Sequence, residues 1–188
     1  MEEKSRIRKE VFADRKRISD AEVHEKSLTI LEKIVALPAY QDAAEVFVYV
    51  DAKHEVETMD FIRRCMADGK KVSAPKVRGK DMDFFYLETL EQLQPGYFGI
   101  LEPAWGEIVD WPKAFMLIPG VAFDPSCHRV GYGQGFYDRY LETHDQHPTV
   151  ALAFDFQIKE AVPFEETDIC PQMVLTETTE YRYDRKGK

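Results

Sequence analysis

Three glycines at alternate positions, Gly131, Gly133 and Gly135, form the stretch of this sequence best suited to chemistry. Glycine tolerates positive φ angles and lets backbone amides approach a ligand closely. A helix is predicted to begin just after these glycines, and free N–H groups at a helix start attract phosphate. Arg129 could add a bidentate phosphate contact, and Asp138 could hold a magnesium ion beside it. The residues therefore indicate a phosphate site, although the spacing also suits a tight strand-to-helix turn with a capping aspartate.

A basic stretch near the N-terminus is a second candidate. Between Lys4 and Arg17, seven Lys and Arg residues stand against only two acidic ones. Lys4 and Arg8 are four residues apart, so they share one face of a predicted helix. The stretch is either a solvated helix face or a local anion site. The whole chain carries a formal net charge of −9, which argues against a nucleic-acid partner.

The pattern of apolar runs predicts the elements that must position these residues. Helices are expected at 3–17, from Ser19 to before Pro38, from Thr58 to Gly69, and at 136–144. Ser19-x-x-Glu22 has the form of a capping box, and Thr58 is a candidate N-cap. Strands are expected at 45–50, 71–75, 82–87, 114–118, 149–154 and 173–176. Residues 88–113 read as an irregular surface connection, because prolines and glycines interrupt them.

Alternating strands and helices predict the fold class. We expect an α/β fold in one domain over residues 1–188, with a mostly parallel central sheet flanked by helices, a Rossmann-like three-layer sandwich. A chain of 188 residues with 44% hydrophobic and 31% charged residues is typical of an ordinary globular domain. No apolar run reaches the ~20 residues of a membrane span, and the N-terminus lacks the apolar core of a signal peptide.

Cysteine and histidine usage gives no sign of a metal or redox centre. Cys65, Cys127 and Cys170 lie far apart, which predicts reduced thiols and a cytoplasmic protein. The five histidines have no ligand spacing and are expected on the surface; they are His24, His54, His128, His144 and His147.

Several ordered motifs resemble those of the 5-formyltetrahydrofolate cyclo-ligase family, also called methenyltetrahydrofolate synthetases. The main motif is Pro119-Gly120, Phe123-Asp124 and then Arg129-Val130-Gly131 through Tyr137-Asp138. Shorter matches are Lys4-x-x-x-Arg8, Leu37-Pro38-x-Tyr40, Glu55 to Thr58, Gly69 to Lys76, Phe98 to Pro103, Ala153-Phe154-x-x-Gln157 and Glu166 to Asp168. One departure is Cys127, which stands where the family usually has a glycine.

The resemblance implies an ATP- and Mg²⁺-dependent reaction. ATP phosphorylates the formyl oxygen of 5-formyltetrahydrofolate, N10 attacks the activated carbon, and 5,10-methenyltetrahydrofolate, ADP and phosphate result. Lys4, Arg8 and Arg129 are then the catalytic cations. The implied ATP site comprises these three together with Val130, Gly131, Tyr132, Gly133, Gln134, Gly135, Phe136 and Tyr137.

The resemblance also implies the remaining site residues. Asp138 and Asp168 match the family's magnesium positions. Val50, Glu55 and Phe98 match substrate-binding positions, and a carboxylate such as Glu55 can accept the paired N–H groups of a reduced pterin. We expect a monomer that acts on 5-formyltetrahydrofolate and ATP, without nucleic acid or membrane.

Two other classes remain open at this point. The chain could be a folate- or nucleotide-binding regulator that keeps the pocket without turnover, but no charge of the phosphate cluster is missing. It could also be a sugar-phosphate isomerase or acyltransferase relative that shares only the sheet, because fold does not fix function.

Overall fold

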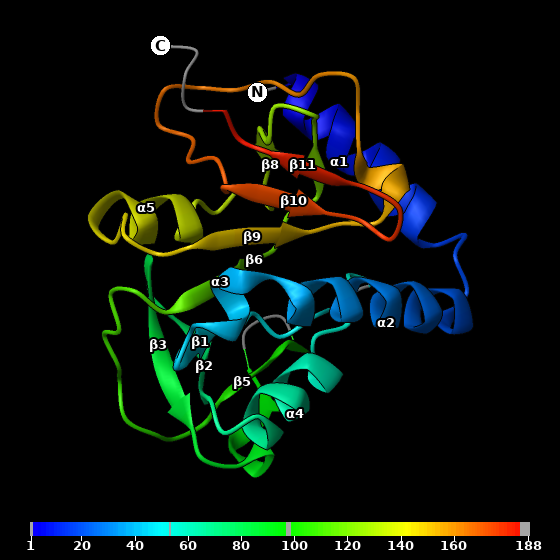
Figure 1. Ribbon diagram of the computed structural model, residues 1–188. Coiled ribbons are helices and arrows are strands. Elements are labelled where there is room, and N and C mark those ends of the chain that lie inside the picture. Colours follow the sequence, from blue (N-terminus) through cyan, green and yellow to red (C-terminus); the bar gives the residue numbers. More distant parts are fainter. Residues whose placement is uncertain (1, 53, 97–98, 185–188) are drawn as a thin grey trace.

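The computed structural model describes residues 2–52, 54–96 and 99–184, and its centre is a seven-stranded sheet (Figure 1). The strand order is β11-β10-β9-β6-β1-β2-β3. Neighbouring strands from β10 to β2 run parallel, and β11 and β3 pair antiparallel at the two edges. The strands are β1 Glu45–Phe47, β2 Lys71–Arg78, β3 Asp81–Leu87, β6 Phe115–Ile118, β9 Thr149–Leu152, β10 Met173–Leu175 and β11 Glu180–Arg182. The expected mostly parallel α/β sheet is confirmed.

Helices cover both faces of this sheet, as the two largest core clusters show. Side chains alternate along β6, so that Phe115 and Leu117 face one cluster while Met116 and Ile118 face the other. The first cluster includes residues of α2 (Asp20–Ala36), α3 (Pro38–Gln41) and α4 (Met59–Ala67), and the second includes Leu141 of α5 (Phe136–Thr143). The layers are therefore helices, sheet and helix.

The N-terminal helix α1 (Glu2–Arg15) packs on a third, smaller cluster. Ile7 and Val11 contribute from the helix, and Val121, Ala122, Val130 and Val162 contribute from the segments beneath it. Two of these segments form a short hairpin of β7 (Ala122–Phe123) and β8 (Arg129–Val130). This packing places the basic face of α1 beside the glycine turn that follows β8.

Several local expectations are wrong in detail. Strand β2 continues through Pro75 to Arg78, because β3 pairs with it along this length, with Phe84 opposite Pro75, while β1 pairs only with Lys71 to Ser73. Residues 88–113 contain the 3₁₀ helix η1 (Leu90–Gln92) and a ribbon of β4 (Leu93–Pro95) and β5 (Leu101–Pro103).

Two side chains also differ from expectation. Thr58 stands at the N-cap of α4 without capping it, because its hydroxyl donates to the carbonyl of Tyr49 at 2.8 Å. His147 is not on the surface; it is 1% exposed and bonds through Nδ1 to the carbonyl of Ala114.

The 3₁₀ helix η3 (Asp155–Gln157) completes the described helices. Within the described part of the chain, no helix combines the length and apolar character needed to cross a bilayer.

Candidate functional site

The glycine turn lies between β8 and α5 and depends on left-handed backbone at two positions. Gly133 has φ +96° and Gly135, the N-cap of α5, has φ +66°. A β-carbon at Gly135 would lie 2.9 Å from Nη1 of Arg139, and one at Gly133 would lie 3.5 Å from the guanidinium carbon of Arg8. The left-handed φ angles, rather than these side-chain contacts, favour glycine at both positions, and the turn leaves its backbone close to a cation of α1.

Arg8 reaches the glycine turn from α1, and Lys4, on the same helix face, reaches the loop of Glu165 and Asp168. Arg8 Nε donates to the carbonyl oxygen of Gly131 at 2.7 Å. Lys4 Nζ pairs with Asp168 at 2.7 Å and with Glu165 at 3.0 Å. Burial lowers the pKa of Lys4, but the hydrogen bonds that its ammonium donates to Asp168 and Glu165 outweigh burial and leave the pKa raised above 10.5. Lys4 therefore stays charged at neutral pH.

Arg129 and Asp138 face each other across the turn. Arg129 is 8% exposed, and its Nη2 donates to Oδ1 of Asp138 at 2.7 Å while Nη1 donates to the carbonyl of Pro119 at 3.1 Å. The backbone N–H of Ile169 also donates to Oδ1 of Asp138, at 3.2 Å. This contact brings the residue next to Asp168 against Asp138, so the two predicted metal ligands belong to one region.

The donor set suits magnesium. Asp138 and Asp168 offer carboxylate oxygens, which are the ligands that this small, hard cation prefers. Among the residues that the structure describes, no group of three or more His, Cys, Asp and Glu side chains is arranged to hold a metal. Two carboxylates supplemented by phosphate oxygens and water are the usual magnesium arrangement in nucleotide sites. The residues present therefore fit a magnesium ion that arrives with a phosphate ligand.

The predicted substrate residues lie where β1 ends. Val50 is buried in the first core cluster, and Glu55 is 7% exposed. The Glu55 carboxylate accepts from the backbone N–H of Ala52 at 2.9 Å and, in a short contact, from the hydroxyl of Tyr132. Burial raises the pKa of Glu55 above its usual value, although Arg15 and the Tyr132 hydroxyl oppose the shift. Phe98 lies outside the described residues.

Other residues of the predicted ATP site have more varied surroundings. Val130 is buried beneath α1, and Gln134 is exposed with its carbonyl accepting from Arg139 at 2.8 Å. Phe136 packs partly against the second core cluster. Among the described residues, the buried hydroxyl of Tyr137 has no hydrogen-bond partner, and its ring lies 5.9 Å from the Arg129 guanidinium carbon. A buried donor left in this way suits a ligand group.

Arg15 is the residue that sequence reasoning missed. Its Nη1 donates to the hydroxyl of Tyr132 at 2.5 Å, and its Nη2 donates to the carbonyl of Gly120 at 3.1 Å. The spacing did carry a signal, because Arg15 continues the buried stripe of Ile7 and Val11 at intervals of four residues. A charged residue on an apolar stripe indicates a buried polar partner.

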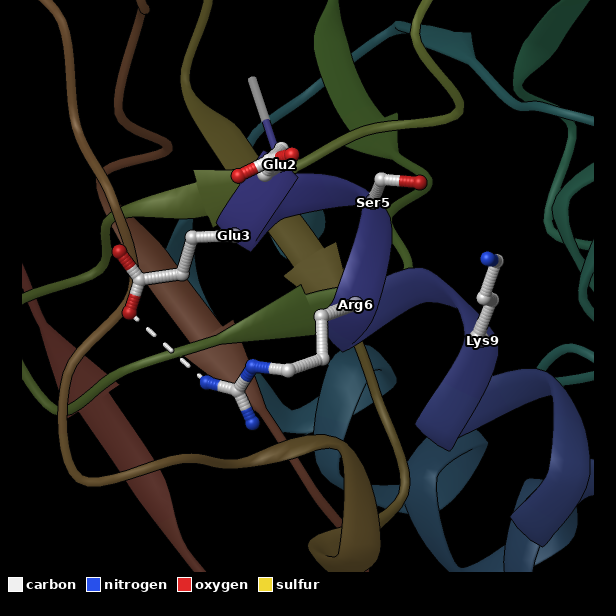
Figure 2. A pocket seen from close by; sticks show the side chains of 5 residues that line it. All are labelled: Glu2, Glu3, Ser5, Arg6 and Lys9. Atoms are coloured by element: carbon white, nitrogen blue, oxygen red, sulfur yellow. Dashed lines mark ion pairs between the residues drawn. The ribbon is translucent and has the colours of Figure 1, made fainter.

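A surface depression on α1 lies on a different side of the helix. Figure 2 shows its lining side chains, Glu2, Glu3, Ser5, Arg6 and Lys9, with Glu3 and Arg6 paired at 3.8 Å. Neither Lys4 nor Arg8 contributes to it. Its mixed charges and open shape give no phosphate site comparable with the glycine turn.

Comparisons with known proteins identify the family of this chain. The model of the 5-formyltetrahydrofolate cyclo-ligase family matches residues 1–177. A probable 5-formyltetrahydrofolate cyclo-ligase of Caenorhabditis elegans is 30% identical over 81% of this chain and 82% of its own length, and the mouse 5-formyltetrahydrofolate cyclo-ligase is 29% identical over 91% and 92%. The solved structure of Aquifex aeolicus 5,10-methenyltetrahydrofolate synthetase has a TM-score of 0.86 and 31% identity, covering 98% of this chain and 94% of that one. This chain therefore belongs to the 5-formyltetrahydrofolate cyclo-ligase family.

Proposed function

We propose that the protein converts 5-formyltetrahydrofolate to 5,10-methenyltetrahydrofolate at the expense of ATP, with ADP and phosphate as the other products. The observation that carries this proposal is that Arg8 and Arg129 lie at the glycine turn while Lys4, on the same face of α1 as Arg8, pairs with Asp168, in a chain of this family. The curated relatives and the Aquifex structure bear the names of this activity. We also propose that it works as one monomeric domain in the cytoplasm. The three free cysteines support the cytoplasmic location.

The phosphate side of the reaction needs positive charge more than a protein nucleophile. Phosphoryl transfer to the formyl oxygen spreads negative charge over the moving group, and positioned cations stabilise that charge. Lys4, Arg8 and Arg129 supply the cations, and the turn from Gly131 to Gly135 supplies backbone donors. Asp138 and Asp168 are the residues we assign to Mg²⁺, which when bound neutralises charge on the ATP phosphates.

The folate side depends on Glu55. An ionised carboxylate accepts two hydrogen bonds, which matches the adjacent N–H groups of the reduced pterin ring. The backbone of Ala52 and the hydroxyl of Tyr132 already fix the carboxylate, so that it needs little reordering when a ligand arrives. Val50 supplies an apolar wall beside it. This arrangement orients the formyl group and N10 toward the cations of the turn, so that N10 attacks the activated carbon and phosphate leaves.

A direct assay tests the proposal. Purified protein mixed with 5-formyltetrahydrofolate, ATP and Mg²⁺ should give rising absorbance of methenyltetrahydrofolate, and omission of ATP should abolish the rise. The control is Arg129→Gln, which removes a buried cation of the site and should slow the reaction strongly. Tight binding of both ligands with no product would instead favour a regulator that holds folate and nucleotide without turnover.

A further inference from the structure

A polar chain of three side chains, buried at its two ends, joins distant segments behind the candidate site. Arg15 at the end of α1 donates to the hydroxyl of Tyr132 in the glycine turn, and that hydroxyl donates to Glu55 after β1. Tyr132 is 117 positions from Arg15 and 77 from Glu55, so only the fold brings the three together. Arg15 and Glu55 are 3% and 7% exposed, whereas Tyr132 between them is 38% exposed. The chain thus places a cation and a carboxylate in the interior with a phenol hydroxyl between them.

The direction of the hydrogen bonds makes this chain polarised. The guanidinium donates to the phenol oxygen, which makes the phenol a stronger donor to the carboxylate. Each bond to a charged group is stronger than a neutral one. Burying charge costs stability, however, and replacing it with apolar side chains is often neutral or stabilising. A chain built in this way therefore needs a reason beyond folding.

We propose that Arg15 and Tyr132 are positioning residues that hold the Glu55 carboxylate in a fixed orientation for the pterin ring and tie it to the phosphate-binding turn. The inference rests on the proposed function, since it assumes that Glu55 receives the folate. Arg15 also donates a hydrogen bond to the carbonyl of Gly120, which follows strand β6, and so fixes one end of the polar chain. Gln157 donates to the same carbonyl at 3.1 Å, so the anchor point is itself held in place. The side chain of Tyr132 thereby acts on folate, although its backbone belongs to the nucleotide turn.

The charges around Glu55 give this proposal a measurable consequence. The groups that face Glu55 are Arg15 of α1, Tyr132 of the glycine turn, Tyr137 of α5, and Tyr49 and Asp51 of its own segment. Burial raises the pKa of Glu55, and Arg15 and the Tyr132 hydroxyl hold the rise down. Removing either one should therefore raise that pKa further. Folate binding needs the ionised carboxylate of Glu55. On acidification, these variants should therefore lose folate binding at a higher pH than the wild type does.

Three variants test the role of the polar chain from Arg15 through Tyr132 to Glu55. Tyr132→Phe and Arg15→Met should each raise the KM for 5-formyltetrahydrofolate by roughly tenfold or more, with the KM for ATP within about twofold of wild type. The acidic limb of the pH profile of kcat/KM for folate should move to higher pH in both. Arg15→Lys keeps a cation that can reach Tyr132, so it should recover part of the folate affinity.

Tyr40→Phe is the matched control. The hydroxyl of Tyr40 donates to Asp68 at 2.7 Å, and Arg64 pairs with the same carboxylate at 2.9 Å, so the same three chemical groups meet away from the site. The control should leave both KM values and the pH profile unchanged. Equal folate KM values in wild type, Tyr132→Phe and Arg15→Met would overturn the proposal.

A measurement without turnover separates this proposal from the proposed function. The side-chain carboxyl of Glu55 can be titrated by ¹³C NMR in the ligand-free protein, with Glu55→Gln used to assign its signal. A higher midpoint in Tyr132→Phe and Arg15→Met than in wild type supports the chain even if no methenyl product forms. Absence of product from the wild type overturns only the proposed function. A Glu55 titration midpoint that is the same in wild type and in both variants overturns the positioning role of Arg15 and Tyr132.

Discussion

At the residue scale, the hydrogen bonds of Asp138 decide which substitution tests its role. Its Oδ1 accepts from Arg129 and from the N–H of Ile169, so alanine would remove structural bonds together with the proposed metal ligand. Asp138→Asn keeps an acceptor oxygen and removes the charge. We expect kcat to fall about 100-fold or more, with a melting temperature close to wild type and a higher Mg²⁺ requirement.

The control for this prediction is Asp83→Asn. Asp83 pairs with Arg78 at 3.1 Å on the hairpin of β2 and β3, where Arg78 is exposed and Asp83 is half-buried. This change should leave the rate and the Mg²⁺ dependence unaltered. An Asp138→Asn protein with the rate and Mg²⁺ dependence of wild type would remove Asp138 from the metal site.

His147 gives the protein a pH-dependent stability. Burial lowers the pKa of His147 below 6.5, and the carbonyl of Ala114 accepts from its Nδ1. Between that lowered value and 6.5 the unfolded chain binds more protons than the folded one, so the free energy of unfolding falls as pH falls. The maximal loss is about 1.4 kcal/mol per pH unit in that window.

The comparison for this prediction is His147→Asn, whose amide can keep the bond to Ala114 but cannot titrate. Urea unfolding at pH 7.5 and pH 5.5 should show a larger drop in wild type than in the variant. Equal drops in the two proteins would mean that another group controls acid sensitivity.

At the scale of elements, the hairpin of β7 and β8 positions Arg129 through a strained residue. Cys127 has φ +64°, a left-handed conformation that costs a residue with a β-carbon about 1–2 kcal/mol. The family resemblance leads one to expect glycine at this position, and the backbone angle explains why. Burial of the Cys127 side chain in the second core cluster offsets part of that strain.

Two substitutions at Cys127 separate strain from packing. Cys127→Gly and Cys127→Ala both remove the sulfur, but only alanine keeps the β-carbon. We expect the glycine variant to be about 1 kcal/mol more stable than the alanine variant, as measured by chemical unfolding. Alanine equal to or more stable than glycine would show that the left-handed backbone carries no strain here.

Elements with local signals could be predicted from the sequence, and elements set by distant partners could not. The capping box of Ser19 and Glu22 forms as predicted and begins α2 at Asp20. Thr58 has equally good capping chemistry, but Tyr49 and Asp51 take its hydroxyl. The ribbon of β4 and β5 was missed because its pairs join residues up to ten positions apart within a segment broken by prolines and glycines.

At the scale of the whole molecule, the site depends on contacts that no spacing can report. Resemblance to a family, rather than spacing, favours a phosphate loop over a tight turn between Gly131 and Gly135. Lys4 and Arg8 share a helix face by sequence alone, but their partners Asp168 and Gly131 lie 164 and 123 positions away. The partners of Arg15 are equally distant, since its acceptors are the carbonyl of Gly120, which follows β6, and the hydroxyl of Tyr132 in the glycine turn.

The packing of α1 predicts that the proposed site can open while the central sheet stays folded. Its 14 residues would be only marginally helical alone, and it is held by a satellite cluster rather than by either large core. Such a segment opens at a lower free energy than the central sheet. Whenever α1 detaches, Lys4 and Arg8 leave together, so each opening empties the site of two cations. Amides of α1 should therefore exchange with deuterium much faster than those of β6, and heating should abolish activity several degrees below the melting transition. Exchange in α1 as slow as in β6 would contradict this, and would make catalysis and global folding a single event.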